Sequence, residues 1–212
     1  MANSIPDRKP QMNDSCELVA RIGYTTAISA DEILDAALTL GDVNGWEYLT
    51  LSQIARFLKV SLADIHCHFK QKDELVDAWF DRADATMLAR FPEQGASMSR
   101  TQRLNLAIQV WLDTLSAHHK LTGEMLLYKL EPGHVHLQAA ALQRISRTVQ
   151  WLREAADLKA TNIARIGQEV ALSTLFVSIF IYWLNDKSKH QKKTRQRLQQ
   201  SLNRGKWIRL WV

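Results

Sequence analysis

The amino-acid sequence predicts an all-α protein, and three observations support this. Apolar residues recur every three or four positions through most of the chain, which is the period of an amphipathic helix. Only 4 of the 212 residues are proline and 8 are glycine. Runs of β-branched residues bounded by turn residues, which mark strands, are absent. We therefore expect about nine helices and no sheet.

The first helices are marked by their N-terminal caps. A Ser or Thr three positions before Glu, Gln or Asp can form a capping box, in which each side chain bonds the backbone N–H of the other residue. Gly41 can end the first helix, Asn44-Gly45 forms a turn, and a fourth helix runs from Asp73 towards Phe91. The capping pairs are Ser29 with Glu32, Thr50 with Gln53, and Ser61 with Asp64.

The second half of the sequence is helical in pattern throughout. We expect helices at 103–118, 123–130, 135–156, 163–184 and 189–211, with a break at Glu131-Pro132-Gly133. Small and polar residues at 93–99 mark a domain boundary. The expected organisation is a flexible tail at 1–27, an N-terminal domain at 28–91 and a C-terminal domain at 92–212.

Residues Leu49 to Leu75 have the pattern of a helix-turn-helix. A small residue, Ala55, allows two short helices to cross closely, as this motif requires. The apolar residues of both helices share one face, so the opposite face of the second helix is free for a DNA groove. On that face we expect Leu62, Ala63, His66, Cys67 and His68.

The same stretch resembles the TetR family of bacterial one-component regulators. The family's usual glycine in the turn is Lys59 here, and its usual tyrosine near the end of the recognition helix is His66. If Lys59 needs a positive φ, the strain is on the order of 1 kcal/mol. The residues that match the family pattern are Ala36-Ala37, Thr50, Ile54-Ala55, Val60-Ser61, Phe69, Lys72 and Leu75.

The resemblance implies a cytoplasmic homodimer that binds double-stranded DNA at a palindromic operator, most simply as a repressor. Thr50 and Lys72 would hold phosphates and Lys59 would add charge, while the second helix reads base edges. The residues expected at the DNA are Thr50, Ser52, Gln53, Lys59, Ser61, Leu62, Ala63, His66, Cys67, His68 and Lys72.

The C-terminal half is expected to hold a small hydrophobic ligand and the dimer interface. Its longest apolar run, Val170 to Leu184, has 15 residues, fewer than the roughly 20 that span a bilayer. The expected pocket residues are Trp111, Met125, Tyr128, Trp151, Ser173, Phe176 and Phe180, with Ser173, Thr174 and Ser178 as polar groups that orient the ligand. The expected interface residues are Leu175, Ile179, Trp183, Leu198 and Leu202.

Charge is unevenly distributed and leaves a second hypothesis open. The net charge is −5 over residues 1–91 and +10 over residues 92–212, and no acidic residue follows Asp186. Residues 148–156, 182–188, Thr194 and Leu198 resemble lipid-binding accessory proteins of ubiquinone biosynthesis, which share the TetR-like fold. That resemblance implies a lipid carrier that touches membranes through the basic segment 204–212.

The sequence contains few residues that would indicate redox chemistry, metal binding or catalysis. The two cysteines, Cys16 and Cys67, are consistent with a reducing cytoplasm. The histidines at 66, 68, 118, 119, 134 and 136 are adjacent or two apart, whereas helical zinc ligands are three or four apart. No phosphate-binding loop or nucleophile elbow is present. We expect no metal, no cofactor and no enzymatic activity.

Overall fold

The computed structural model describes residues 28–91, 98–129 and 135–211, with the side chains of 135–142 left out. Within these ranges it contains nine α-helices, two short 3-10 helices and no strand, which confirms the all-α prediction. The α-helices are α2 (Ala30–Asn44), α3 (Leu51–Leu58), α4 (Leu62–His68), α5 (Lys72–Ala89), α7 (Arg100–Leu115), α8 (His119–Lys129), α9 (Val135–Ala155), α10 (Asn162–Leu184) and α11 (Lys192–Trp207).

The three predicted capping boxes are all present. The hydroxyls of Ser29, Thr50 and Ser61 accept hydrogen bonds from the backbone N–H three residues on, at 3.1 to 3.2 Å. Lys59 ends α3 in the left-handed conformation, with φ 58° and ψ 38°. The turn between α3 and α4 therefore requires the positive φ that a glycine would adopt without strain.

Several boundaries differ from the sequence-based expectation. Gly41 does not end the first helix, since α2 continues to Asn44 and its C-cap is Gly45. Helix α7 begins at Arg100 because Ser99 and Gln102 form a further capping box. Helix α8 begins at His119, directly after the 3-10 helix η1 (Ser116–His118). Helix α11 follows η2 (Lys189–Gln191) and ends at Trp207, because the chain reverses near Arg209, which has a φ of 55°. The predicted tail, most of the linker at 93–99 and the break at 131–133 lie outside the described residues.

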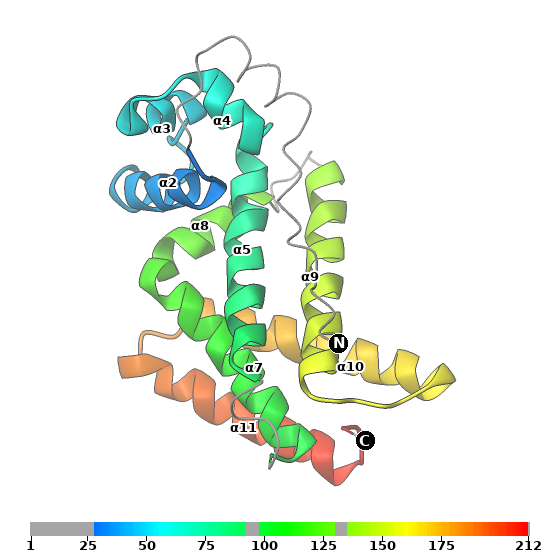
Figure 1. Cartoon of the computed structure of the whole chain (residues 1–212). Coiled ribbons are helices and arrows are strands. Elements are labelled where there is room, and N and C mark those ends of the chain that lie inside the picture. The colour runs from blue at the N-terminus through cyan, green and yellow to red at the C-terminus, as the bar shows by residue number, and fades with distance from the viewer. Residues whose placement is uncertain (1–27, 92–97, 130–134, 212) are drawn as a thin grey trace, which may run out of the picture.

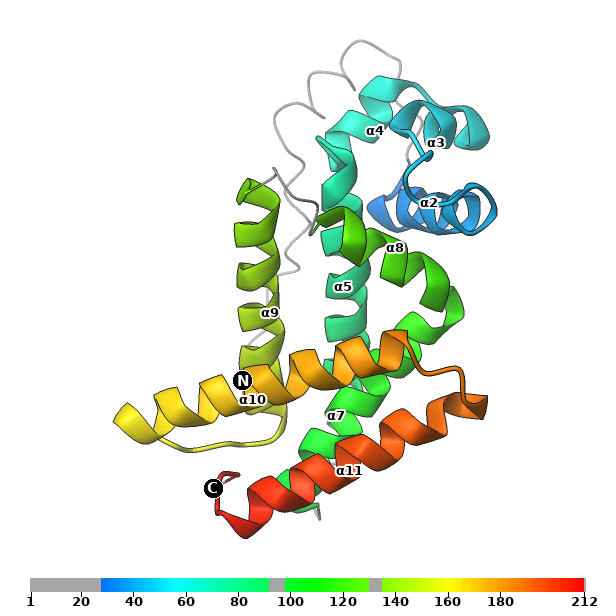
Figure 2. The same cartoon turned by 180° about the vertical axis from the view of Figure 1, so that it is seen from behind.

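Helix α5 forms the long axis of the molecule (Figure 1). Helices α3 and α4 lie at one end of it, with α2 beside them, and α10 and α11 lie towards the other end. Figure 2 shows α10 and α11 running side by side across the face turned to the viewer, with α7 behind them. A single cluster of buried apolar side chains extends through all these layers, from Ile33 in α2 to Trp211 after α11.

A hydrogen-bonded corner connects α10 to α11. One carboxylate oxygen of Asp186 accepts from the Thr194 N–H and hydroxyl at 2.8 and 2.7 Å, and the other accepts from the Ser188 N–H at 2.9 Å. Thr194 and Leu198 are fully buried beneath this corner. Asp186, Thr194 and Leu198 therefore have a structural role at the corner that orients α11.

The corner also determines the titration of Asp186. Partial desolvation raises the pKa of its carboxyl, but the hydrogen bonds from Ser188 and Thr194 outweigh this and hold the pKa far below its ordinary value. The ionised form therefore stabilises the fold. That stability is fully present above the ordinary carboxyl pKa of about 4 and is lost as the pH falls below it.

The variant Asp186→Asn should be less stable than the native chain at pH 7, by about 1 kcal/mol for the lost cap. The difference should shrink as the pH falls below about 4, because Asp186 then begins to take up a proton in the unfolded chain, which stabilises the unfolded state of the native sequence only. Urea unfolding at a series of pH values measures the stability difference at pH 7 and its change with pH. Glu154→Gln, which alters an exposed carboxylate, is the control. If native chain and Asp186→Asn lose stability in parallel towards low pH, the corner does not depend on the charge of Asp186.

Candidate functional site

Helices α3 and α4 form a tightly packed pair joined by the turn at Lys59. Ile54, Ala55 and Ile65 are buried between the helices and α2, and the small side chain of Ala55 allows the close crossing that was expected. Most of the predicted DNA-contact residues lie on the outer surface of this pair. Those that are exposed are Thr50, Ser52, Lys59, Ser61, Leu62, Ala63, His66 and His68, whereas Gln53 and Lys72 are half-buried.

Cys67 does not belong to this outer surface. It is buried, with 8% of its area exposed, so the prediction that it faces a DNA groove is wrong. The reason is helical phase, because Cys67 lies three residues after Asp64, whose side chain also points inward. The outward face of α4 therefore consists of Leu62, Ala63 and His66, with His68 at its end.

The α3–α4 surface is positively charged although the N-terminal half of the chain is acidic. Residues 50–71 contain three cations, Arg56, Lys59 and Lys70, all exposed. Their one acidic residue, Asp64, is only 2% exposed and accepts hydrogen bonds from the Ser61 N–H and hydroxyl at 2.8 and 2.7 Å. The capping box thus takes the negative charge off the surface.

Many of the remaining carboxylates before residue 92 are paired on other sides of the molecule. Arg82 binds the two acidic residues near the start of α2, and cations from α8 and α9 bind acidic residues of α5. The pairs are Asp31 and Asp35 with Arg82, Asp42 with His118, Asp73 and Asp77 with Lys129, and Asp81 and Asp84 with Arg144. The acidic composition therefore does not oppose an anionic partner at the α3–α4 end.

Lys72 differs from its predicted use as a phosphate contact. Its Nζ donates to the carbonyl oxygens of Trp46 and Glu47 at 2.5 and 3.1 Å. It also lies 5.1 Å from the ring centres of both Trp46 and Tyr128. Desolvation lowers the pKa of Lys72, and the nearby charge of Glu47 opposes this. In this structure Lys72 ties the start of α5 to the loop that leads into α3.

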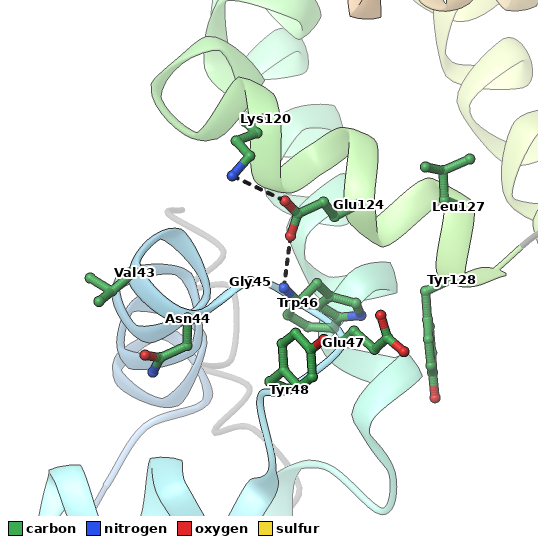
Figure 3. Close-up of a pocket in the computed structure, with 10 residues that line it drawn as sticks. All are labelled: Val43, Asn44, Gly45, Trp46, Glu47, Tyr48, Lys120, Glu124, Leu127 and Tyr128. Atoms are coloured by element: carbon green, nitrogen blue, oxygen red, sulfur yellow. Dashed lines mark hydrogen bonds and ion pairs between the residues drawn. The ribbon is translucent and has the colours of Figure 1, made fainter.

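The same loop is held by α8, as Figure 3 shows. Glu124 accepts a hydrogen bond from the backbone N–H of Trp46 at 2.8 Å and lies 3.5 Å from the ammonium of Lys120. One turn earlier, Leu121 packs so closely on Gly41 that a Cβ there would lie 2.9 Å from its methyl groups. Tyr128, which was predicted for a ligand pocket, lines this hollow between α8 and the loop instead.

A separate, mainly apolar cavity of about 200 Å³ lies among α5, α7, α8, α9 and α10. Three of the predicted pocket residues, Trp111, Phe176 and Phe180, line it together with Phe80. The other predictions are corrected. Met125 is buried but is not among the lining residues, Trp151 is 43% exposed, and Ser173 lines an outer groove of α10 with Thr174 and Ser178.

Buried ionic groups close one side of this cavity. Asp84 accepts hydrogen bonds from Arg144 Nη1 at 2.8 Å, from Trp111 Nε1 at 2.8 Å and from the Thr148 hydroxyl at 3.1 Å. Lys129 donates to Asp77 at 2.8 Å and is 3% exposed. This ionic group was not predicted from the sequence. The available signal was the spacing of Asp73, Asp77, Asp81 and Asp84, which are three or four residues apart and therefore share one side of α5.

The predicted dimer residues do not lie on an accessible surface. Ile179, Trp183, Leu198 and Leu202 are at most 1% exposed within one chain, so their assignment to an interface is wrong, and Leu175 is half-buried. They join α10 and α11 to the core instead. The apolar residues of α10 that do face outward are Ile163, Ile166, Val170 and Ile181, and Trp207 and Ile208 are exposed at the end of α11.

Helix α10 is long and apolar enough to cross a membrane by length and composition, with 33% of its most apolar window buried. Such a helix also occurs in the core of soluble proteins. Here one side of α10 packs on the core, and its buried Gln168 donates to the carbonyl oxygen of Leu210 at 2.9 Å. The unusual apolarity therefore reflects two apolar sides, one inside the protomer and one on its surface.

Two of the described histidines, His118 and His119, take part in structural contacts. His118 Nδ1 lies 2.5 Å from an oxygen of Asp42, and His119 Nε2 lies 2.9 Å from the carbonyl oxygen of Trp183. In the described part of the chain no three His, Cys, Asp or Glu side chains are grouped as metal ligands would be. His134 and the side chain of His136 lie outside it.

Comparisons with known proteins identify the family. Residues 33–79, which include α3 and α4, match the family described as bacterial regulatory proteins, tetR family. The chain is 40% identical to the TetR transcriptional regulator from Nitrosomonas europaea ATCC 19718, with a TM-score of 0.74, over 84% of this chain and 97% of that one. The chain belongs to the TetR family.

Other solved TetR structures share the fold at lower identity. A TetR transcriptional regulator from Rhodococcus sp. RHA1 is 17% identical, with a TM-score of 0.58, over 81% of this chain and 93% of its own. A regulator of the TerR/AcrR family from Aquifex aeolicus VF5 is 13% identical, with a TM-score of 0.54, over 82% and 96%. No curated protein matches the chain. This chain thus has the fold of the TetR-family transcriptional regulators.

Replacing Asp84 by Asn in this TetR-family chain is expected to lower the free energy of unfolding by about 3 to 5 kcal/mol. Arg144 would then keep a buried charge beside only the exposed Asp81. The control is Asp81→Asn, which removes the exposed partner of the same guanidinium and should cost less than about 1 kcal/mol. Urea unfolding measures both values. Equal losses in the two variants would mean that Asp84 does not hold the helices together.

Proposed function

We propose that the chain is a homodimeric DNA-binding regulator, most simply a repressor, and that a small hydrophobic ligand controls its affinity for a palindromic operator. One observation carries the proposal. The α3–α4 surface exposes three cations and the outward residues of α4, while its carboxylate at Asp64 is buried in a capping box. Phosphate neutralisation by such cations supplies much of the affinity of DNA-binding proteins.

Contacts between a protein and DNA are of two kinds: those to phosphates, which position the protein on the duplex, and those to base edges, which read the sequence. Arg56, Lys59 and the capping residue Thr50 are exposed around α4 and are proposed to contact phosphates. Leu62 and Ala63 are proposed to contact thymine methyl groups, and His66 a base edge in the major groove. Lys72 acts indirectly in this arrangement, by fixing the loop before Thr50.

The outward face of α10 and the adjoining face of α11 are proposed to pair with those of a second chain. Ile163, Ile166 and Val170 recur along one side of α10 and are exposed in the single chain, as is Ile181 further along. Two helices from each protomer would form a four-helix arrangement with twofold symmetry. The two α3–α4 ends would then contact half-sites about one helical turn of DNA apart, or a multiple of that.

Helix α8 is the proposed link between the cavity and the DNA-binding end. Leu126 and Lys129, near its C-terminal end, line the cavity. Leu121 and Glu124, further towards its N-terminal end, contact Gly41 and the loop at Trp46. A ligand that displaces the first pair therefore moves the second, and with it the start of α3.

The described residues give no separate support to a lipid-carrier function or to a membrane contact by the C-terminal segment. Asp186, Thr194 and Leu198 build the α10–α11 corner. Trp211, at the end of the basic segment, is buried and donates to the carbonyl oxygen of Leu202 at 2.9 Å. The regulator is proposed to be cytoplasmic and to need no cofactor.

DNA binding is tested with a fragment from upstream of the chain's own gene. Lys59→Ala should weaken binding and reduce the slope of log affinity against log salt by about 2 for a dimer, because each protomer loses one phosphate contact. Lys206→Ala, an equally basic change at the far end of the molecule, is the control and should leave the slope unchanged. Fluorescence anisotropy at several salt concentrations measures the affinity for DNA and hence this slope.

A second DNA fragment carries deoxyuridine in place of thymidine and so lacks the methyl group that is proposed to contact Leu62. This replacement should weaken the binding of the native chain more than it weakens the binding of the Leu62→Ala variant. The DNA-binding proposal is contradicted if the native chain shows no salt-dependent binding, or if Lys59→Ala and Lys206→Ala have equal slopes.

Dimerisation is tested with Val170→Asp, which places a charge in the centre of the proposed interface. The variant should be a folded monomer at micromolar concentration, because burying an unpaired carboxylate is strongly unfavourable. Val43→Asp, at the exposed end of α2, is the matched control and should remain a dimer. Sedimentation velocity measures the mass of each. A dimeric Val170→Asp would exclude this face of α10 as the interface.

A further inference from the structure

The cavity among α5, α7, α8, α9 and α10 has a size that limits what it can hold. Its volume of about 200 Å³ is below the roughly 300 Å³ at which sites for drug-sized ligands begin. A cavity of about 150 Å³ in another protein takes up benzene. Four aromatic side chains from three helices, Phe80, Trp111, Phe176 and Phe180, are among the residues that line it. The space therefore fits one aromatic ring with a small substituent.

The carboxylates around the cavity outnumber the buried cations. Lys129 is 2.8 Å from Asp77 and 3.8 Å from Asp73. Arg144 is 2.8 Å from Asp84 and 3.3 Å from Asp81. Four carboxylates thus face two buried cations, with Arg147 3.6 Å from Asp81 at the exposed edge. A ligand carboxylate would enter a group that already has a surplus of negative charge.

A cationic ligand is no better accommodated. Asp84, which lies behind the wall, already accepts from Arg144, Trp111 and Thr148, and these donors occupy both of its oxygens. Asp77, the carboxylate that lines the cavity, accepts from Lys129. A new cation would have to displace one of these donors and leave it buried without an acceptor. The walls therefore favour a neutral ligand.

Two donors of one side chain at the wall have no hydrogen-bond acceptor among the described residues. Arg144 lines the cavity and is 5% exposed, and its Nε and Nη2 are both buried without a hydrogen-bond partner. Nη2 lies 3.3 Å from the carboxylate of Asp81, whereas no ion pair among the described residues involves Nε. A buried donor left unsatisfied is unfavourable, so an acceptor supplied by a ligand at this wall gains the interaction. The guanidinium lies over the ring of Phe80, 5.9 Å from its centre, next to the space for the aromatic ring.

We infer that the cavity takes a neutral, single-ring aromatic molecule with one hydrogen-bond acceptor, of the aryl ketone type, and that the acceptor binds Arg144 Nε. The inference rests on the proposed function, because it assigns the chemical class of the ligand to the cavity proposed there. The other polar side chains that line the cavity, Asp77, Lys129 and Thr148, already make hydrogen bonds within the protein, so the acceptor distinguishes this ligand from a hydrocarbon of the same shape.

Three probes of nearly equal size test this by isothermal titration calorimetry on the full chain without DNA. Acetophenone has the acceptor, α-methylstyrene replaces the carbonyl oxygen by a methylene group, and benzoate is charged. Acetophenone should bind about tenfold more tightly than α-methylstyrene, as expected for a hydrogen bond to a charged group. Benzoate should not bind measurably.

Two variants assign the effect to its atom. Arg144→Lys keeps a cation for Asp84 but removes the Nε donor, so acetophenone and α-methylstyrene should then bind equally. Arg147→Lys makes the same change one turn along α9 at an exposed position, and should preserve the tenfold preference. If Arg144→Lys does not fold, the ranking of the three probes on the native chain still decides the inference.

Benzoate binding more tightly than acetophenone would overturn the inference, and so would equal affinity of acetophenone and α-methylstyrene for the native chain. A tenfold preference that persists in Arg144→Lys would also overturn it. The proposed regulation is measured separately, by release of DNA on addition of acetophenone. Probe binding without DNA release contradicts the proposed control of DNA affinity and leaves the ligand class supported.

Discussion

The ion pair between Asp84 and Arg144 is the interaction on which the arrangement of the C-terminal helices depends. Asp84 lies on the central helix α5, and its three donors come from α7 and α9. Both side chains of the pair are only 7% exposed, so each needs the other to remain charged inside the protein. Because these helices also form the walls of the aromatic cavity, the same contact sets the shape of that space.

A second principle of the structure is the separation of charge within the N-terminal half. Carboxylates on α2 and α5 are turned towards cations of the neighbouring helices, and Asp64 is enclosed by its own capping box. Among the described residues, Arg56, Lys59 and Lys70 pair with no carboxylate, and all three are exposed. An acidic segment can therefore present a basic surface at one end. Net charge describes such a segment poorly, since the placement of each charge depends on helical phase.

Local signals in the sequence predicted much of the fold and less of the site. Capping residues such as Thr50 located the helix starts, since a cap is a short-range interaction between neighbours. The outward face of α4 followed from periodicity, except at Cys67. Periodicity could not orient α10, because both of its sides are apolar, and the buried Ile179 was mistaken for an interface residue. The pairing of Asp84 with Arg144 joins positions 60 residues apart, which no local pattern encodes.

The turn residue Lys59 joins two demands that oppose each other. Its left-handed backbone, with φ 58°, is the conformation in which glycine is preferred, yet its side chain is one of the few exposed cations at this end of the molecule. A glycine would remove the backbone strain at this turn but also the positive charge, whereas lysine keeps the charge and the strain. Lysine at this position therefore costs some stability of the α3–α4 pair and increases the long-range attraction of this end of the molecule to DNA. Selection for thermal stability would favour glycine at position 59, whereas selection for fast association with DNA would favour lysine.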